Sequence, residues 1–368
     1  MFGSKYEIDR RHFLLAASAL GIGGSIVSRA AFAADPFVWM GWQGYDGCFQ
    51  GGKALEGHGL SMSPTYINAN EDIITKLQAG GVGQVDLATI YFGYLPILVG
   101  AGLVEPIDES RLAAIGAIFP EFLNNDALRF DGRLYGVPFT WGSFPMVYDP
   151  AAVAAPTSWR DVLKDEYKGK VLLVDDPVAL VQIWAPIVTE NKDPGALSPE
   201  DLSKTIDFLI DLKKNHARAL APGYGEAADM FARNEVVISA VGWEAMVGFA
   251  AAKGKEIKYV VPQEGTAIFM DCLCIPKSSP HLDAAYAMAD ACLSVDGQMT
   301  VANELSQAVV NQEAAKGVPA ENMTMYQYEN LAKLFETARL YNFFPLESDG
   351  SVVTYDQMLE EYQRFQKA

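Results

Sequence analysis

Short apolar runs, rich in β-branched and aromatic residues and ended by glycine, proline or acidic residues, recur along the chain. Runs of this kind between turn residues are typical of buried β-strands. We therefore expect strands over residues 37–40, 85–90, 171–176, 235–241 and 265–276.

Between these runs the apolar residues recur every three or four positions, which indicates amphipathic helices. Leu202, Ile206 and Leu209 share one face of such a helix, which Ser198 and Pro199 begin as N-cap and first helical residue. Further helices are expected near Ser158, over residues 95–103, from Ser279-Pro280 to about residue 293, and after the capping box that begins at Thr354. Strands that alternate with helices predict an α/β fold with largely parallel sheets.

The strand expected over residues 265–276 carries a single acidic residue, Asp271. Since alternate side chains of a strand share a face, Phe269 lies on the same face as Asp271. A lone carboxylate in an apolar strand is unfavourable without a positive or hydrogen-bonding partner, and no Lys or Arg lies between Glu264 and Lys277. An aromatic ring beside a carboxylate suits an organic amine, through cation–π contact and a charge-assisted hydrogen bond. The alternative is an aspartate that caps a neighbouring loop.

Other aromatic and acidic residues also stand at or just past the ends of expected strands. They are Trp42, Tyr91, Asp176 and Trp243, and Tyr45 lies in the glycine-rich loop after the first strand. In open α/β sheets, ligands bind outside the carboxyl ends of the strands. Together with Asp271, these residues predict one ligand-binding cleft.

The N-terminus is typical of an export signal. The twin arginine Arg10-Arg11 precedes an apolar segment that runs to about Val27, and Ala31-Phe32-Ala33 forms an A-x-A cleavage site. We predict a twin-arginine (Tat) signal peptide over residues 1–33, cleavage near Ala33, and a soluble protein in the periplasm. The alternative is a retained membrane anchor. No other segment is long and apolar enough to span a bilayer.

The length of 368 residues and the hydrophobic content of 50% suit a globular protein with about two domains. The formal net charge is −18, and removal of residues 1–33, which hold four basic and two acidic residues, changes it to −20. So acidic a protein repels nucleic acid and anionic lipid and favours cationic ligands. We therefore expect no nucleic-acid partner.

Motifs of catalysis and metal binding are missing from residues 34–368. There is no H-E-x-x-H, paired C-x-x-C, G-x-S-x-G, Walker loop or dinucleotide fingerprint, and the histidines are scattered. Asp175 and Asp176 are adjacent in an expected strand, so their side chains point apart, which does not suit catalysis by two carboxylates. We expect no catalytic residue, no metal and no cofactor.

The four cysteines do not form a disulfide framework. Cys272 and Cys274 share one strand face, and Cys292 lies in an apolar helical run, so we expect three buried free thiols. A bridge that involves Cys48 stays open as an alternative in an oxidising compartment.

Several short motifs, in a consistent order and spacing, resemble one known family. They are Asp86-Leu87 through Gly102-Leu103 to Ile107-Asp108, Tyr135-Gly136-Val137-Pro138 with Trp141-Gly142, Tyr167-Lys168-Gly169, Val260 to Gly265, and Phe269-Met270-Asp271 with Ile275-Pro276. Nearly the whole chain after residue 33 is similar to the periplasmic spermidine- and putrescine-binding subunits of ABC importers, within the extracellular solute-binding proteins.

This resemblance implies the type II periplasmic binding protein fold, in which two α/β lobes close on a ligand about a hinge. It places lobe 1 at residues 34–141 and 270–316, and lobe 2 at residues 142–269 and 317–368. In the family, a polyamine lies between aromatic rings, with carboxylates at its amines. The matching residues here are the aromatic Trp42, Tyr45, Trp243 and Phe269 and the acidic Asp176 and Asp271.

Some positions depart from the family pattern. Ala179 stands where spermidine-binding members have a glutamate, Gly93 where they have a tyrosine, and Gln307 where another tyrosine is usual. Tyr91 lies beside the first tyrosine position, and Glu244 could replace the missing acid or face solvent. We include Tyr91, Glu244 and Gln307 among the candidate ligand-binding residues.

We therefore expect a non-enzymatic, monomeric substrate-binding subunit of an ABC importer, whose partners are membrane permease subunits. It would capture a polyamine such as putrescine or spermidine, or a related small amine, by lobe closure. The departures favour a ligand with fewer charged ends than spermidine, such as putrescine, 4-aminobutyrate or a quaternary amine. One alternative is the same fold with another solute, for example an amino acid, a betaine, an opine or a sugar conjugate. The other is a Tat-exported enzyme with a cofactor.

Overall fold

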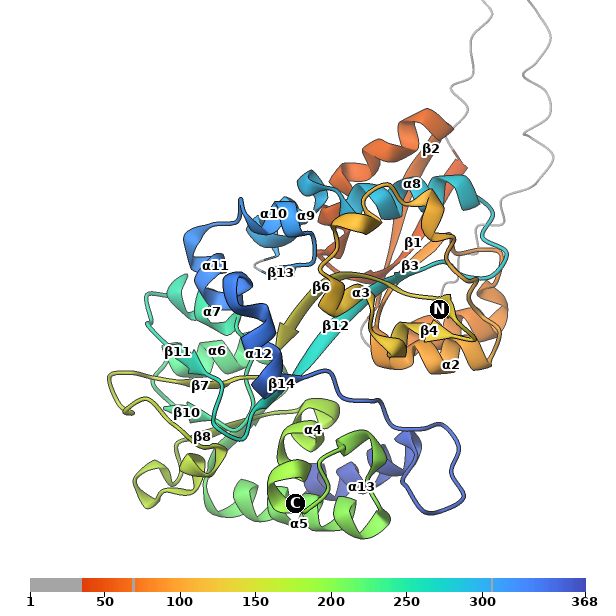
Figure 1. The fold of residues 1–368 in the computed structure, drawn as a ribbon. Coiled ribbons are helices and arrows are strands. Elements are labelled where there is room, and N and C mark those ends of the chain that lie inside the picture. The colour runs from red at the N-terminus through yellow and green to blue at the C-terminus, as the bar shows by residue number, and fades with distance from the viewer. Residues whose placement is uncertain (1–34, 68–69, 306) are drawn as a thin grey trace, which may run out of the picture. The chain divides into compact units, whose positions relative to one another are not determined.

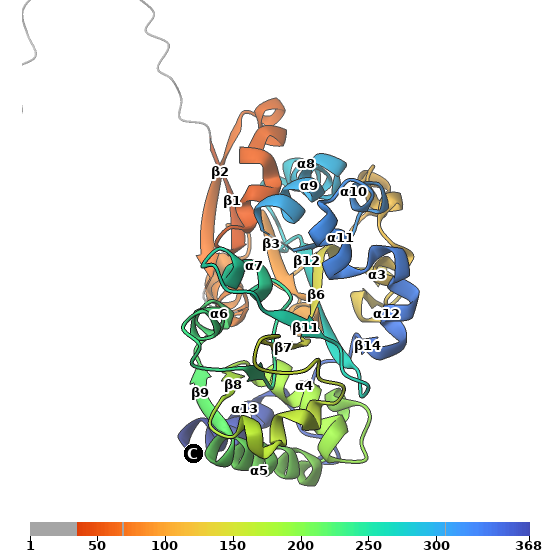
Figure 2. The same ribbon diagram turned by 90° about the vertical axis from the view of Figure 1, so that its left-hand side faces the viewer.

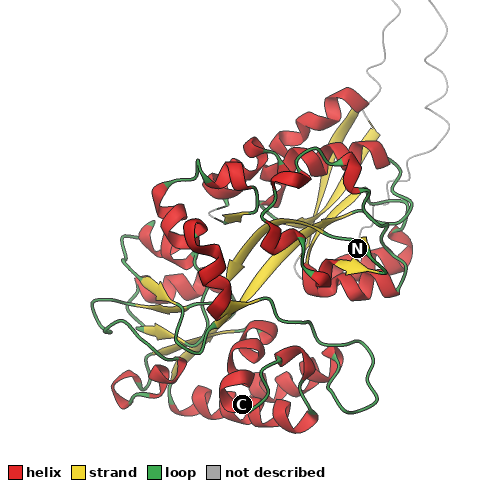
Figure 3. Ribbon diagram, viewed as in Figure 1, coloured by secondary structure: helices red, strands yellow, loops and turns green. Residues whose placement is uncertain are grey.

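Two β-sheets with helices around them organise the part of the chain that the structure describes (Figure 1). In this computed structural model, that part comprises residues 35–67, 70–305 and 307–368. The predicted export signal, residues 1–33, lies outside the described residues. Helices and strands alternate along the chain, as Figure 3 shows, which confirms the predicted α/β class.

The first sheet has seven strands. Its order is β13 (Ala308–Val309), β6 (Val137–Ser143), β12 (Thr266–Cys274), β3 (Leu87–Tyr91), β1 (Asp35–Trp42) and β2 (Leu60–Ile67), and β14 (Ala338–Arg339) pairs with the start of β12. β1 runs parallel to β2 and β3, whereas β12 runs antiparallel to β3 and β6.

The second sheet has five strands. Its order is β11 (Lys258–Val260), β7 (Met146–Tyr148), β10 (Ile238–Ser239), β8 (Val171–Val174) and β9 (Ala217–Ala221). β8 is parallel to β9 and β10, and β7 is antiparallel to β10 and β11. A separate small hairpin joins β4 (Arg129–Phe130) to β5 (Arg133–Leu134).

The chain passes twice between the two sheets. It leaves the first sheet through β6, turns at Phe144-Pro145 into β7, and returns from β11 into β12. Figures 1 and 2 both show β6 and β12 side by side, close to β7 and β11. Because one crossing strand runs out and the other runs back, the two are antiparallel. The expectation of largely parallel sheets is therefore wrong, and both sheets are mixed.

Helices cover the faces of the sheets. The α-helices are α1 (Glu71–Lys76), α2 (Leu95–Gly100), α3 (Pro120–Leu123), α4 (Pro177–Val188), α5 (Pro199–Asn215), α6 (Tyr224–Ala232), α7 (Met246–Ala251), α8 (Leu282–Leu293), α9 (Val295–Glu304), α10 (Gln312–Ala315), α11 (Ala320–Tyr326), α12 (Leu331–Thr337) and α13 (Tyr355–Lys367). The 3₁₀ and π segments are η1 (Tyr45–His58), η2 (Leu77–Gly81), η3 (Phe92–Tyr94), η4 (Glu109–Arg111), η5 (Ile115–Ala117), η6 (Asp126–Leu128), η7 (Trp159–Leu163), η8 (Asp165–Tyr167), η9 (Pro194–Ala196) and η10 (Tyr328–Asn330).

The last helix, α13, connects the layers of the two sheets. It packs on α5, where the Lys213 ammonium donates to the carbonyl oxygen of Phe365 at 2.9 Å. Its first residue, Tyr355, lies beside the first sheet instead. The Tyr355 hydroxyl is 2.7 Å from the Tyr94 hydroxyl and donates to Glu71 Oε1 at 2.7 Å. One C-terminal helix therefore contacts α5 beside the second sheet and both α1 and η3 beside the first.

Several predicted helix starts are confirmed. Ser198 caps α5, with Pro199 at its first position, and Thr354 caps α13 in a capping box. The start expected at Ser279-Pro280 is wrong, because α8 begins only at Leu282 and His281 at its N-cap makes no side-chain cap.

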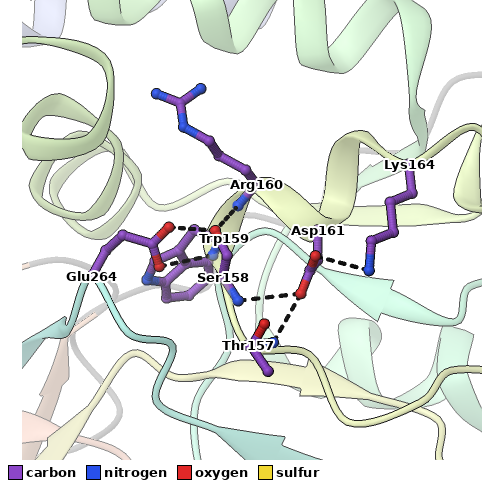
Figure 4. A network of polar contacts seen from close by, with 7 residues as sticks. All are labelled: Thr157, Ser158, Trp159, Arg160, Asp161, Lys164 and Glu264. Carbon is purple, nitrogen blue, oxygen red and sulfur yellow. Dashed lines mark hydrogen bonds and ion pairs between the residues drawn. The ribbon is translucent and has the colours of Figure 1, made fainter.

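The cap at Ser158 also ties η7 to the loop before β12 (Figure 4). Ser158 and Asp161 form a capping box, and Asp161 Oδ2 accepts from the backbone N–H of Thr157 at 2.8 Å. Glu264 accepts hydrogen bonds from the Ser158 hydroxyl and from the N–H of Trp159 (Figure 4). The start of the crossing strand β12 is therefore fixed to the second sheet's layer by polar contacts.

Within the described ranges, no helix combines the length and the apolar character that a membrane crossing requires.

Candidate functional site

A chain of hydrogen bonds from four parts of the sequence ends at the carboxylate of Asp271. The Thr140 hydroxyl donates to Gln307 Oε1 at 3.0 Å, and Gln307 Nε2 donates to the Tyr45 hydroxyl at 3.1 Å. The Tyr45 hydroxyl in turn donates to Asp271 Oδ2 at 2.6 Å. Three of the predicted site residues are thus in one network, which fixes the position of the carboxylate in β12.

Asp271 lies where the first sheet is irregular. It pairs with Tyr91 of β3 on one side and with Thr140 of β6 on the other, and the register to β6 shifts between Asp271 and Cys272. Such irregularities bend a strand and re-aim side chains. Tyr91 and Asp271 therefore lie together, as predicted, but only Tyr91 ends its strand; the prediction that Asp271 lies at a strand end is wrong, because it lies inside β12.

The carboxylate of Asp271 is in an unfavourable environment for its charge. It is only 6% exposed, and burial raises its pKa to about 6, against the opposing effect of the Tyr45 hydrogen bond. Among the described residues, no basic side chain contributes to its pKa. A buried carboxylate without a positive partner is costly, so this position favours a cationic ligand group.

Aromatic rings surround the approach to β12 from the second sheet. Phe269 lies 6.3 Å from Trp243 and 5.3 Å from Phe144 between ring centroids, and Tyr224 lies 6.0 Å from Trp243. Phe269 sits over Gly142, where a Cβ atom would come within 2.4 Å of the ring. The structure therefore confirms that Trp243 and Phe269 are neighbours, and glycine at position 142 leaves room for the ring.

Trp243 also has an unsatisfied donor. Its indole nitrogen is buried and has no hydrogen-bond acceptor among the described residues. The hydroxyl of Tyr91 and the side-chain amide of Gln182, which lies on α4, are also buried and make no hydrogen bond of good geometry to the described residues. They face each other, because burial raises the pKa of Tyr91 and an interaction with the Gln182 amide lowers it. Buried polar groups are normally satisfied by protein, water or ligand. These groups are therefore candidates for ligand contacts, and Gln182 was not among the predicted residues.

Asp176 has a structural role that can coexist with ligand binding. It is the N-cap of α4, where its Oδ1 accepts from the N–H of Ala179 at 2.9 Å. Its Oδ2 accepts from the hydroxyl of Tyr224 at 2.8 Å, and burial raises its pKa. Its neighbour Asp175 accepts from Tyr362 at 2.9 Å, so the two carboxylates have different partners. The prediction that both lie in a strand is wrong, because β8 ends at Val174.

Phe343 fills the space beside Gly93. A Cβ atom at Gly93 would lie 2.4 Å from the ring of Phe343 and 2.7 Å from that of Tyr91. The Phe343 and Tyr91 ring centroids are 5.9 Å apart.

The sequence patterns did not predict Phe343, because it lies in an irregular stretch before α13 with no periodic pattern. They missed Tyr224 as well, although this residue follows closely after strand β9, where the strand-end argument could have found it.

Glu244 and Trp42 stand apart from these contacts. Both carboxylate oxygens of Glu244 accept from the backbone N–H of Ser143, at 3.0 and 3.1 Å, and the Ser143 hydroxyl donates to Oε1 as well. Burial raises the pKa of Glu244 to about 7. This side chain is thus bound to the end of the crossing strand β6. Trp42 ends β1 opposite Ile67 and is partly exposed.

A cavity of about 1050 Å³ lies elsewhere, between α7, β11 and the helices α9, α11 and α12. None of the predicted site residues lines it, and its charged lining residues are Lys258, Lys333 and Glu336. Two lysines against one glutamate do not suit a cationic ligand. The chemistry for an amine lies at Asp271, so we place the candidate site there. No group of acidic, histidine and cysteine side chains in the described ranges is arranged to hold a metal ion.

Two sheet layers joined by paired crossing strands are typical of two-lobed solute-binding proteins. Solved structures support this class. The spermidine/putrescine ABC transporter substrate-binding protein PotD from Streptococcus pneumoniae has a TM-score of 0.73 and 23% identity, over 90% of this chain and 99% of that chain. The Atu4243 GABA receptor has a TM-score of 0.63 and 18% identity, over 82% of this chain and 96% of that chain.

The sequence comparison agrees with the fold. The spermidine/putrescine-binding periplasmic protein of Escherichia coli K12 is 28% identical over 316 residues, which cover 83% of this chain and 85% of the relative. The bacterial extracellular solute-binding protein family matches residues 53–332. This chain belongs to that family, whose members are transport components, and the resemblance inferred from the short motifs is confirmed.

Proposed function

We propose that this protein is the substrate-binding subunit of an ABC importer and that it captures a polyamine or a related small amine between its two lobes. One observation carries the proposal. The buried carboxylate of Asp271 is held by Tyr45 at 2.6 Å, has no basic partner among the described residues, and shares β12 with the aromatic Phe269.

An amine would satisfy this site in two ways. An ammonium group would donate a charge-assisted hydrogen bond to Asp271, and its methylene chain and charge would lie against Trp243 and Phe269. Asp176, at the N-cap of α4, would be the second acid, for the other end of a diamine. The acidic net charge of −18 for the whole chain also favours a cation. The name of one relative, the spermidine/putrescine-binding periplasmic protein of Escherichia coli K12, supports the same ligand chemistry.

We propose Trp42, Tyr45, Tyr91, Asp176, Trp243, Phe269, Asp271 and Gln307 as ligand-site residues, with Tyr45 and Gln307 acting through Asp271. Glu244 belongs to the same proposal only indirectly. Its bonds to Ser143 support a role in fixing β6, beside the rings, and not one in contacting the ligand.

The lobes would be residues 34–141 with 270–316 and residues 142–269 with 317–368, and the ligand would be enclosed as they close. The connections from β6 to β7 and from β11 to β12 support these limits, because both fall where the chain passes between the sheets. β14 pairs with Thr266 and Ala267, which lie in the same proposed lobe as β14 itself.

A second candidate ligand is an amino acid such as 4-aminobutyrate. The indole N–H of Trp243 is a buried donor with no acceptor among the described residues, and a polyamine offers none. A carboxylate or hydroxyl on the ligand would supply one. A betaine, an opine or a sugar conjugate could do so too. No observation supports a cofactor enzyme, and we propose that the protein has no catalytic activity of its own.

The remaining parts of the proposal concern export, cellular location and partners. The protein would be exported by the twin-arginine pathway, cleaved near Ala33, and act as a monomer in the periplasm, delivering its ligand to membrane permease subunits. The R-R motif and the A-x-A site support the export route. The periplasmic location of the relative supports the compartment.

The test is a thermal-shift screen followed by calorimetry, with putrescine, spermidine, 4-aminobutyrate and glycine betaine. Binding to the native state alone adds about 2.7 kcal/mol of stability at a hundredfold excess over Kd. We expect a shift with an amine that is lost in Asp271→Asn and kept in Asp207→Asn, which removes an exposed carboxylate instead. A shift with 4-aminobutyrate alone would indicate that the ligand is an amino acid and not a polyamine. A response to none of the four, or one unchanged in Asp271→Asn, would refute the amine site.

A further inference from the structure

Two thiols from segments far apart in the sequence meet beside the first sheet. Cys48 lies in η1 and Cys292 near the end of α8, and both side chains are fully buried. Their Sγ atoms are 3.1 Å apart, and Cys48 Sγ also donates to the carbonyl oxygen of Tyr45 at 2.8 Å. A disulfide bond is about 2.05 Å long, so the sulfurs need approach each other by only about 1 Å.

We propose that Cys48 and Cys292 form a disulfide bond that joins η1 to α8 in an oxidising compartment. The geometry of the pair carries this inference, and only the compartment rests on the proposed export. The bridge would link residues 244 positions apart and so constrain the unfolded chain strongly.

The other two cysteines offer an internal comparison. Cys272 and Cys274 are also fully buried, but they are two residues apart on one strand, β12. Their Cα atoms are then about 6.6 Å apart, near the upper limit for a disulfide, and neighbouring side chains on one strand face stand parallel. We therefore expect this pair to stay reduced under conditions that oxidise Cys48 and Cys292.

The reaction is a two-electron oxidation by a disulfide reagent. One cysteine thiolate attacks a sulfur of the reagent, which releases one thiol and leaves a mixed disulfide. The second cysteine thiolate then attacks the protein sulfur of that mixed disulfide, forms the bond between Cys48 and Cys292, and releases the second thiol. The two cysteine protons end on the two released thiols. Because burial raises the pKa of the Cys48 thiol, the reaction requires local opening or takes place during folding.

The bridge would act on the segment that carries Tyr45. Tyr45 precedes Cys48 by one helical turn of η1, and it holds Asp271 from that position. η1 contains left-handed backbone at Gly51 and Gly52, with φ of 66° and 75°, and packs against α8 and α9. A covalent link from η1 to α8 would therefore restrict a segment whose regular helical bonding is interrupted.

The experiment equilibrates the full-length protein with oxidised and reduced glutathione, both in the native state and during refolding from urea. Free thiols are then alkylated in denaturant, and the protein is analysed by intact mass and by peptide mapping. We expect two alkylated cysteines, a linked peptide that contains Cys48 and Cys292 in at least one of the two conditions, and a Tm about 5 °C higher than that of the reduced protein.

Variants separate the bridge from other effects of oxidation. Cys292→Ala should remove the linked peptide and the redox-dependent change in Tm, whereas Cys272→Ala should keep both. If Cys292→Ala does not fold, the peptide map of the wild-type protein still shows whether Cys48 and Cys292 are linked. Four alkylated cysteines in both conditions, a glutathione adduct without the link, or a link between other cysteines would overturn the proposal. All these readouts are made without an amine, so they can fail or succeed independently of the proposed ligand.

Discussion

The hydroxyl of Tyr45 donates to the carboxylate of Asp271 at 2.6 Å, across a separation of 226 residues in the sequence. A hydrogen bond to a charged acceptor typically contributes about 1.5–3 kcal/mol. In Tyr45→Phe the Asp271 carboxylate loses this donor, its pKa rises further, and its charged form becomes less available for an amine. We expect about tenfold weaker amine binding at pH 7.5 by calorimetry.

The matched control for this variant is Tyr286→Phe, which also removes one hydroxyl. Tyr286 accepts from the N–H of Asp108 at 2.7 Å and makes no contact with Asp271. Its loss should leave amine affinity unchanged. Equal affinities of Tyr45→Phe and the wild type would show that the hydroxyl does not support the carboxylate.

The pH dependence of amine binding follows from the pKa of about 6 for Asp271. Alkylammonium groups stay protonated throughout the neutral range, so of the two groups that would meet, the ammonium and Asp271, only the carboxylate changes charge between pH 8 and pH 5. Affinity should be constant above pH 7 and about tenfold lower at pH 5, because binding there must first displace the proton. Calorimetry across this range measures the effect. Asp271→Asn should bind weakly and show no such decline.

Glu244 should lower stability at high pH. Its pKa is raised by burial to about 7, from an ordinary value near 4.5, so the folded state binds the proton more tightly than the unfolded state. Its contribution to stability is therefore fully present below pH 4.5 and is lost as the pH rises through 7. Glu244→Gln, which keeps an acceptor for the N–H of Ser143, should be about 2–3 kcal/mol more stable than the wild type at pH 8.

Urea unfolding of both proteins at pH 4.5 and pH 8 checks this prediction. The difference between the variant and the wild type at pH 8, relative to that at pH 4.5, isolates Glu244 from other buried acids such as Asp271 and Asp176. A difference that does not change with pH would mean that the carboxylate is accommodated as well in its charged form as in its neutral one.

Substitutions of Trp243 distinguish the two candidate ligand classes. Trp243→Phe keeps an aromatic ring but removes the indole N–H, whereas Trp243→Ala removes both. If the ligand is a polyamine, the phenylalanine variant should lose less than fivefold in affinity and the alanine variant more than tenfold, since cation–π contact is worth about 0.5–2 kcal/mol. Similar losses in both variants would indicate that a ligand acceptor binds the indole N–H.

Local sequence patterns predicted those strands and helices whose limits depend on neighbouring residues in the sequence. β8 begins at Val171 as expected, because its apolar run follows a lysine, and it ends at Val174, two residues earlier than expected, because Asp176 caps α4. β12 and α5 were found for similar reasons. The expected strand over residues 235–241 is shorter in the structure, where β10 covers only Ile238–Ser239, since the apolar run continues past the pairing.

Contacts between distant residues could not be predicted in this way. The direction of β6 and β12 depends on connections of more than a hundred residues, and no local pattern records it. The hydrogen bonds from Ser143 to Glu244, 101 residues away, could not be predicted from local patterns either. The same holds for the packing of Phe343 beside Gly93. The strand-end argument predicted one site for Tyr91 and Asp271, but its reason does not hold for Asp271. The two residues meet because β12 runs antiparallel beside β3, with Asp271 inside the strand, and not because two parallel strands end at one edge.

The bonds of Tyr355 to Tyr94 and Glu71 bear on how the protein would respond to its ligand. They join a helix that packs on α5 to α1 and η3, so they stabilise the present arrangement of the proposed lobes whether or not a ligand is bound. The share of molecules that have this arrangement before the ligand binds would then depend on these bonds. Apparent affinity is proportional to the share of molecules in the arrangement that binds ligand. The C-terminal helix, although it lies outside the proposed binding site, would therefore affect how sensitive uptake is to ligand concentration.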